Sequence, residues 1–132
     1  HPAEIGPAMV KEVEAMLAAI RWPRAAVERF IGEHWTEPGP EVWFRAPQTM
    51  MPFARFLRHA KSRGIRLALG SRMLFRRDQV FINGDTIRVR GAARQALAEL
   101  ADERQAIPWR SRSAQAARQV YDWYRAGYVE HA

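Results

Sequence analysis

The sequence predicts an α+β fold, in which an N-terminal helical segment is followed by a unit of strands and helices. In residues 1–63, apolar side chains recur at helical spacing in three separate stretches. From residue 64 the spacing changes to the alternation typical of strands, and an Asn-Gly pair between two β-prone runs adds a hairpin. We therefore expect a helical segment over residues 1–63 and a second domain over residues 64–132.

The first two predicted helices have wide apolar faces. One begins at Pro7, which suits a first helical turn, and the other begins after Pro23 and ends before Pro38. A helical hairpin this short cannot bury both faces internally, so either the faces pair with a partner or they pack onto the third helix and the second domain. The residues expected to form a homodimer interface are Val13, Met16, Leu17, Ile20, Val27, Phe30 and Ile31.

The next elements follow in order. A short apolar run, residues 42–44, is expected to be extended or strand-like, and a third helix runs from Phe53 to a stop at Gly64. The alternation of Ile65, Leu67 and Leu69 predicts a strand, and Met73-Leu74-Phe75 predicts another.

Residues 80–89 carry the hairpin signal. Asn83-Gly84 favours a two-residue type I′ turn, because both turn residues must tolerate positive φ. Such a turn places Val80 opposite Ile87, and Phe81 opposite Thr86. A fourth helix is expected from Gly91, and a fifth is expected between a cap at Ser111 or Ser113 and a stop at Gly127.

A β-hairpin beside helices is the layout of a winged helix, whose wing can touch phosphates. The arginines expected near the hairpin are Arg77, Arg88 and Arg90. Two interpretations stay open for them, a nucleic-acid contact or an ordinary polar outer face, and we favour the polar face. The net charge is +7, but only two of the 21 basic residues are lysines, a bias that weakens the argument for nucleic acid.

Composition and motifs exclude several functions. There is no cysteine, no apolar run of about 18 residues that could span a membrane, and no signal-peptide pattern, so we expect a cytoplasmic protein without a membrane partner. None of the four histidines is followed two positions later by a carboxylate, and no zinc-protease, phosphate-loop or serine-hydrolase motif occurs. We therefore expect no catalytic, cofactor or metal-binding residue in this chain, and no enzyme by itself.

Several segments carry a resemblance to a known family. They are Val27-Glu28-Arg29-Phe30-Ile31-Gly32 with residues 36–44, Arg63-Gly64-Ile65-Arg66-Leu67, Val80-Phe81-Ile82-Asn83-Gly84-Asp85, Leu100-Ala101-Asp102-Glu103-Arg104, and residues 122–128. In order and spacing they resemble the C-terminal region of bacterial cupin-type (JmjC-like) ribosomal protein arginine hydroxylases. The chain begins His1-Pro2, and we expect the parent protein to continue upstream.

The resemblance implies a parent in three parts. A catalytic cupin domain binds Fe(II) and 2-oxoglutarate and hydroxylates an arginine of a large-subunit ribosomal protein. A helical dimerisation segment and a winged-helix domain follow, and this chain resembles only these two. The resemblance therefore implies a non-catalytic dimerisation and substrate-supporting region that forms a homodimer. The alternative, which uses Arg77, Arg88 and Arg90, is a free-standing winged-helix module that binds nucleic acid.

Overall fold

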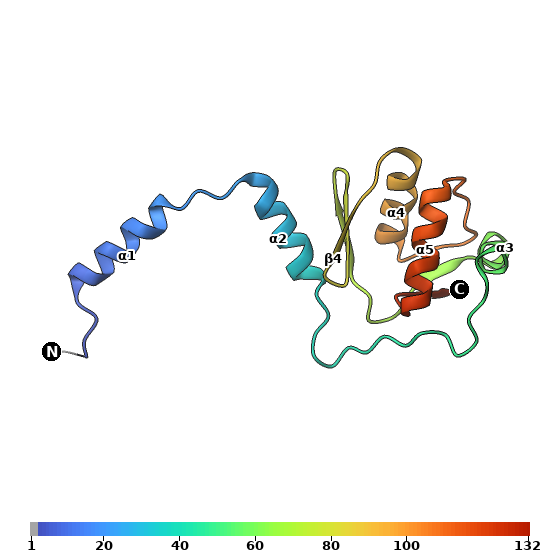
Figure 1. The fold of residues 1–132 in the computed structure, drawn as a ribbon, viewed down its shortest axis with the longest axis horizontal. Coiled ribbons are helices and arrows are strands. Elements are labelled where there is room, and N and C mark those ends of the chain that lie inside the picture. Colours follow the sequence, from blue (N-terminus) through green and yellow to red (C-terminus); the bar gives the residue numbers. More distant parts are fainter. Residues whose placement is uncertain (1–2) are drawn as a thin grey trace.

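The computed structural model describes residues 3–132. His1 and Pro2 of the predicted helical segment lie outside the described residues. The helices are α1 (Pro7–Ala19), α2 (Arg24–Thr36), α3 (Phe53–Arg63), α4 (Gly91–Glu103) and α5 (Ala114–Ala126). The strands are β1 (Ile65–Leu67), β2 (Met73–Arg76), β3 (Gln79–Ile82), β4 (Asp85–Arg88), β5 (Gln105–Ala106) and β6 (Val129–His131). The α+β class is confirmed, and Figure 1 shows α1 standing apart from a body formed by the elements after α2.

The hydrophobic core of the body lies between α3, α4, α5, a small antiparallel sheet with strand order β5-β1-β6, and one side of strands β2 and β3. Phe56 of α3, Leu97 of α4 and Val120 of α5 are fully buried in it. The ring of Phe56 lies 4.7 Å from that of Tyr124. Because Phe56 lies in the same core as residues of the second half, this core crosses the predicted boundary after residue 63. That boundary stays a prediction.

Strands β2, β3 and β4 form a second antiparallel sheet, in which the predicted hairpin register is confirmed. Val80 pairs with Ile87, and Phe81 pairs with Thr86. The turn residue Asn83 has φ of 49° and Gly84 has φ of 91°, so both take the positive angles that a type I′ turn requires. Asn83 is buried, its side-chain oxygen accepts the backbone N–H of Arg72 at 2.9 Å, and its amide donates to Ser71.

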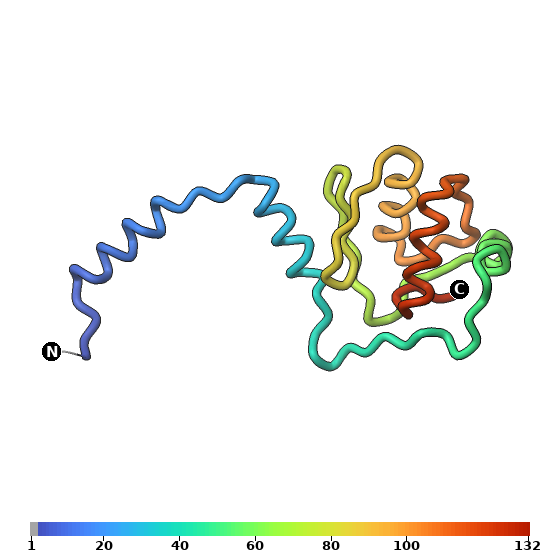
Figure 2. The backbone as a smooth tube through the Cα atoms, viewed as in Figure 1, coloured from blue at the N-terminus to red at the C-terminus, as the bar shows by residue number. Residues whose placement is uncertain are grey.

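A segment without regular secondary structure, residues 37–52, connects α2 to α3. Figure 2 shows it passing along one edge of the body. The ring of Phe44 meets that of Tyr128 edge-on at 4.9 Å, and the Tyr121 hydroxyl donates to the carbonyl of Met51 at 2.7 Å. Residues 42–44, which were expected to be extended or strand-like, therefore form no strand and belong to a segment that packs against the body.

The predicted fifth helix is confirmed with Ser113 as its cap, since its hydroxyl oxygen accepts the N–H of Ala116 at 3.1 Å. The predicted strand at residues 65–69 is wrong at Leu69, which is 97% exposed. Strand β1 ends at Leu67 because the chain turns back, with the N–H of Ser71 donating to the carbonyl of Ala68.

The predicted helical hairpin of the first two helices is also wrong. No residue of α1 is buried, and Figure 1 shows α1 and α2 placed one after the other along the chain instead of side by side. Residues 20–23 between them take no helical turn, since Ile20 and Pro23 have extended backbone angles.

Candidate functional site

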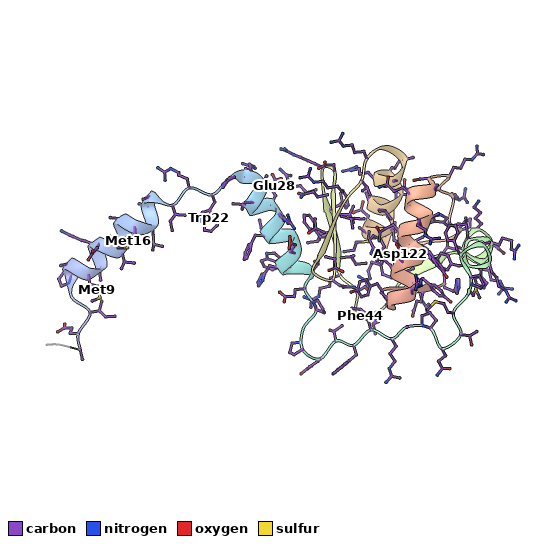
Figure 3. The ribbon with its side chains drawn as sticks, viewed as in Figure 1. Met9, Met16, Trp22, Glu28, Phe44 and Asp122 are labelled. Atoms are coloured by element: carbon purple, nitrogen blue, oxygen red, sulfur yellow. The ribbon has the colours of Figure 1, made fainter. Side chains whose placement is uncertain are left out.

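The N-terminal arm, residues 5–22, exposes most of its large apolar side chains. In the described part of the chain, 12 of the 17 exposed large apolar residues lie between Ile5 and Trp35. Met16 and Leu17 are 59% and 63% exposed, and Figure 3 shows Met9, Met16 and Trp22 projecting from the arm into open space. Of the predicted interface residues, Val13, Met16, Leu17 and Ile20 all belong to this arm. An exposed apolar surface of this extent indicates an interaction site.

Helix α2 docks on the β2-β3-β4 sheet through small and polar residues instead of its apolar stripe. Glu28, Gly32 and Thr36 are spaced four residues apart, so they share one face of the helix. Gly32 and Thr36 are the buried residues of α2. A side chain at Gly32 would overlap the ring of Phe81, so the glycine allows the helix to approach the sheet closely.

The docking face also makes polar contacts with the sheet. The Thr36 hydroxyl donates to the carbonyl of Gly32 at 2.7 Å and accepts the backbone N–H of Gly84 at 2.9 Å. At the other end of α2, a carboxylate oxygen of Glu28 lies 3.1 Å from the guanidinium of Arg76. This hydrogen bond from Arg76 holds the pKa of Glu28 below its ordinary value.

The docking leaves the apolar stripe of α2 largely exposed. Phe30 is 65% exposed and stacks on His34 with ring centroids 5.3 Å apart. Val27 and Ile31 border an open groove of about 710 Å³ between α2 and the sheet. The other residues lining this groove are Trp22, Arg24, Glu28, Gly32, Leu74, Phe75, Arg76 and Phe81. The structure thus brings Val27 and Ile31 together with the sheet, and separates them from the predicted interface residues of α1.

The predicted arginines gather at the turn between β2 and β3, at the opposite end of the sheet from the Asn83-Gly84 turn. Arg77 lies in the β2–β3 turn with φ of 54°, Arg88 ends β4, and Arg90 is the N-cap residue of α4. Helix α2 covers the Phe81 side of the sheet, so Phe81 is only 1% exposed. Arg77, Arg88 and Arg90 themselves are exposed, and both interpretations of them stay predictions.

In residues 3–132, no three His, Asp or Glu side chains come together to hold a metal ion. His34 is an exposed helix-end residue. His59 and His131 are neighbours, with ring centroids 4.0 Å apart. Burial, and secondarily His59, lower the pKa of His131. No helix of the described chain is long and apolar enough to cross a membrane.

Comparison with protein families decides the classification of this fold. The model of the ROXA-like winged helix family matches residues 18–130. The chain belongs to the ROXA-like winged helix family. This membership confirms the predicted family resemblance and the winged-helix fold. A comparison with curated protein sequences gives no significant match.

Solved structures similar to this ROXA-like winged helix chain include ribosomal oxygenases. The Escherichia coli ribosomal oxygenase YcfD superposes with a TM-score of 0.70 at 22% identity, over 99% of this chain and 37% of that one. YcfD in complex with cobalt and 2-oxoglutarate superposes with a TM-score of 0.71 at 19% identity, over 98% of this chain and 37% of that one. This chain therefore spans about 37% of the length of the solved proteins, and the likeness shows a shared fold.

Sequence reasoning missed the docking face of α2 and two arginines near the β2–β3 turn, Arg76 and Arg94. The docking face has a signal, since Gly32 and Thr36 are small residues one helical turn apart. Arg76 and Arg94 have no such signal, because their position depends on a turn at residues 77–78 that carries no glycine or proline.

Proposed function

We propose that this chain is the non-catalytic dimerisation and substrate-supporting region of an Fe(II)/2-oxoglutarate-dependent ribosomal protein arginine hydroxylase. Its partners would be a second copy of the chain, a catalytic cupin domain outside this sequence, and a large-subunit ribosomal protein in the cytoplasm. The exposed apolar arm on a ROXA-like winged helix domain is the observation that carries this proposal.

The described residues do not fit an iron centre. A non-haem Fe(II) site of this kind needs two histidines and a carboxylate facing one point. His59 and His131 are neighbours, but in residues 3–132 no carboxylate joins them to form a group that could hold a metal ion. Iron and 2-oxoglutarate would therefore be held outside this region, and no catalytic step is assigned to its residues.

The arm supports the dimer because a helix like α1 has no stabilising surface of its own. It has 13 residues, and isolated helices shorter than about 12–15 residues are marginal in water. None of its residues is buried against the body. A second copy, with its own exposed arm and exposed α2 stripe, provides an apolar surface that could cover it.

The solution mass of the purified chain, measured by light scattering after size exclusion, tests this proposal. The expected mass is twice that of the 15.2 kDa chain, at low and at high salt, because apolar contacts are not screened. Replacing Met16 and Leu17 by lysine is expected to raise the dissociation constant at least about a hundredfold, since each buried side chain contributes about 1.5–3 kcal/mol.

The matched control replaces Met50 and Leu69 by lysine. These are also exposed, at 40% and 97%, and the change in residue types and charge is the same. This control is expected to stay dimeric. A monomeric wild-type chain at micromolar concentration, or equal weakening by both double variants, would contradict pairing through the arm.

A further inference from the structure

Five arginines surround the turn between β2 and β3. Arg76 and Arg88 both pair with Gln79 across the sheet, one on each side of it. Neighbouring strands lie about 4.8 Å apart, so these two arginines are separated by about 10 Å. Arg77 occupies the turn, Arg90 is the N-cap residue of α4, and Arg94 lies in the first turn of that helix. Figure 1 shows the free end of the sheet and the start of α4 at the same end of the body.

Two of these arginines make contacts within the folded chain. Arg76 bonds to Glu28 of α2, and Arg94 donates to the carbonyl of Arg77 at 2.7 Å while it lies over the ring of Phe75. The other three point outward. Arg90 is 86% exposed, and its nearest carboxylate oxygen, on Asp78, is 3.9 Å away.

The balance of charge at this end is positive. Five arginines face two carboxylates, Glu28 and Asp78. Helix α4 adds to the positive potential, because no acidic residue lies in its first turn and no side chain caps its N-terminal N–H groups. The exposed large apolar side chain next to this cluster is Leu74 of β2, which is 43% exposed and lines the groove between α2 and the sheet.

We propose that this arginine cluster binds the phosphodiester backbone of a nucleic acid. A guanidinium group binds phosphate through two coplanar N–H donors. A surface that binds phosphates needs positive charge, and it needs no apolar side chains at its centre. A protein partner would instead use the apolar groove beside Arg76, which Leu74 and Phe75 line and which Arg77, Arg88 and Arg90 do not. Arg77 has φ of 54° because it is the first residue of a two-residue hairpin turn, and this position holds its side chain at the tip of the sheet. This site does not depend on the arm or on the dimer.

The test is fluorescence anisotropy with a labelled 20-base-pair RNA duplex and the DNA duplex of the same sequence, at several salt concentrations. The variant replaces Arg77 by glycine and both Arg88 and Arg90 by alanine. Glycine accepts the backbone angles of Arg77, so the fold is kept, and circular dichroism verifies it. We expect a loss of affinity of at least tenfold and a salt slope smaller by about 2 to 3, from the loss of three phosphate contacts.

The matched control replaces Arg55, Arg58 and Arg63 of α3 by alanine, which removes the same charge from exposed positions elsewhere on the body. It is expected to change affinity less than threefold. Equal affinity of the wild type for both duplexes would assign the site to phosphates in general, and tighter binding of RNA would assign it to the A-form duplex. Equal losses in both triple variants, or displacement of RNA by poly-glutamate at the same charge concentration, would overturn the proposal.

Discussion

Replacing Gly32 by alanine tests whether α2 is docked on the sheet as described. Inside a helix this change normally stabilises the folded chain by up to about 1 kcal/mol, because alanine has the higher helix propensity. Here the added methyl group would overlap the Phe81 ring, and overpacking of a close contact costs about 1–3 kcal/mol. The free energy of unfolding is therefore expected to fall by about 1 kcal/mol, and by no more than about 2 kcal/mol.

The same substitution in a Phe81→Ala background reverses the sign. Phe81→Ala alone is expected to cost about 3–5 kcal/mol, because the ring is almost fully buried. With the ring removed, the methyl group at position 32 fills space, and Gly32→Ala is expected to stabilise by about 1 kcal/mol. The coupling free energy between the two sites should therefore be at least about 2 kcal/mol.

Urea unfolding followed by far-ultraviolet circular dichroism and tryptophan fluorescence measures this cycle. Gly39→Ala is the control, since nothing lies within 4 Å of the added Cβ, and it is expected to change stability by less than about 0.5 kcal/mol. If Gly32→Ala stabilises the chain equally with and without the Phe81 ring, α2 does not pack on the sheet at this point.

Three further predictions concern stability. Thr36→Val is expected to lower the free energy of unfolding by about 1–3 kcal/mol, because it leaves the Gly84 N–H without its partner, whereas Thr49→Val should have little effect. Because burial lowers the pKa of His131 below 6.5, its protonation favours the unfolded chain. The melting temperature should therefore fall as the pH drops below about 6.5; His131→Gln should weaken this fall, and His34→Gln should not. Arg104→Ala should cost about 1.5–3 kcal/mol in urea unfolding, because the guanidinium donates to the carbonyls of Ser71 and Ala68 at 2.9 and 3.2 Å; an effect equal to that of exposed Arg125→Ala would refute this.

The helices and the β3–β4 hairpin could be predicted because their signals are local. Apolar spacing gave every helix, and Asn83-Gly84 determined both the turn and the strand register. Strands β5 and β6 have two and three residues, too few for any periodicity, and they exist only because β1 pairs with both.

The arrangement of α2 could not be predicted in the same way. Its apolar stripe, with Phe30 and Ile31, suggested the packing face, but the helix docks through Gly32 and Thr36. Close approach to an aromatic ring selects the smallest residue, so the buried face is the less hydrophobic one. The arginine cluster was only partly predicted, because Arg76 and Arg94 join it through the fold of the β2–β3 turn.

Amide hydrogen exchange of residues 7–19, measured across a range of protein concentrations, tests the proposed role of the arm most directly. A 13-residue helix without a partner exchanges almost freely, whereas a helix buried in a dimer is protected. We expect protection of these amides to rise with protein concentration in step with the dimer mass, while protection of α5 stays constant. Amides of residues 7–19 that remain unprotected at every concentration would contradict pairing through the arm.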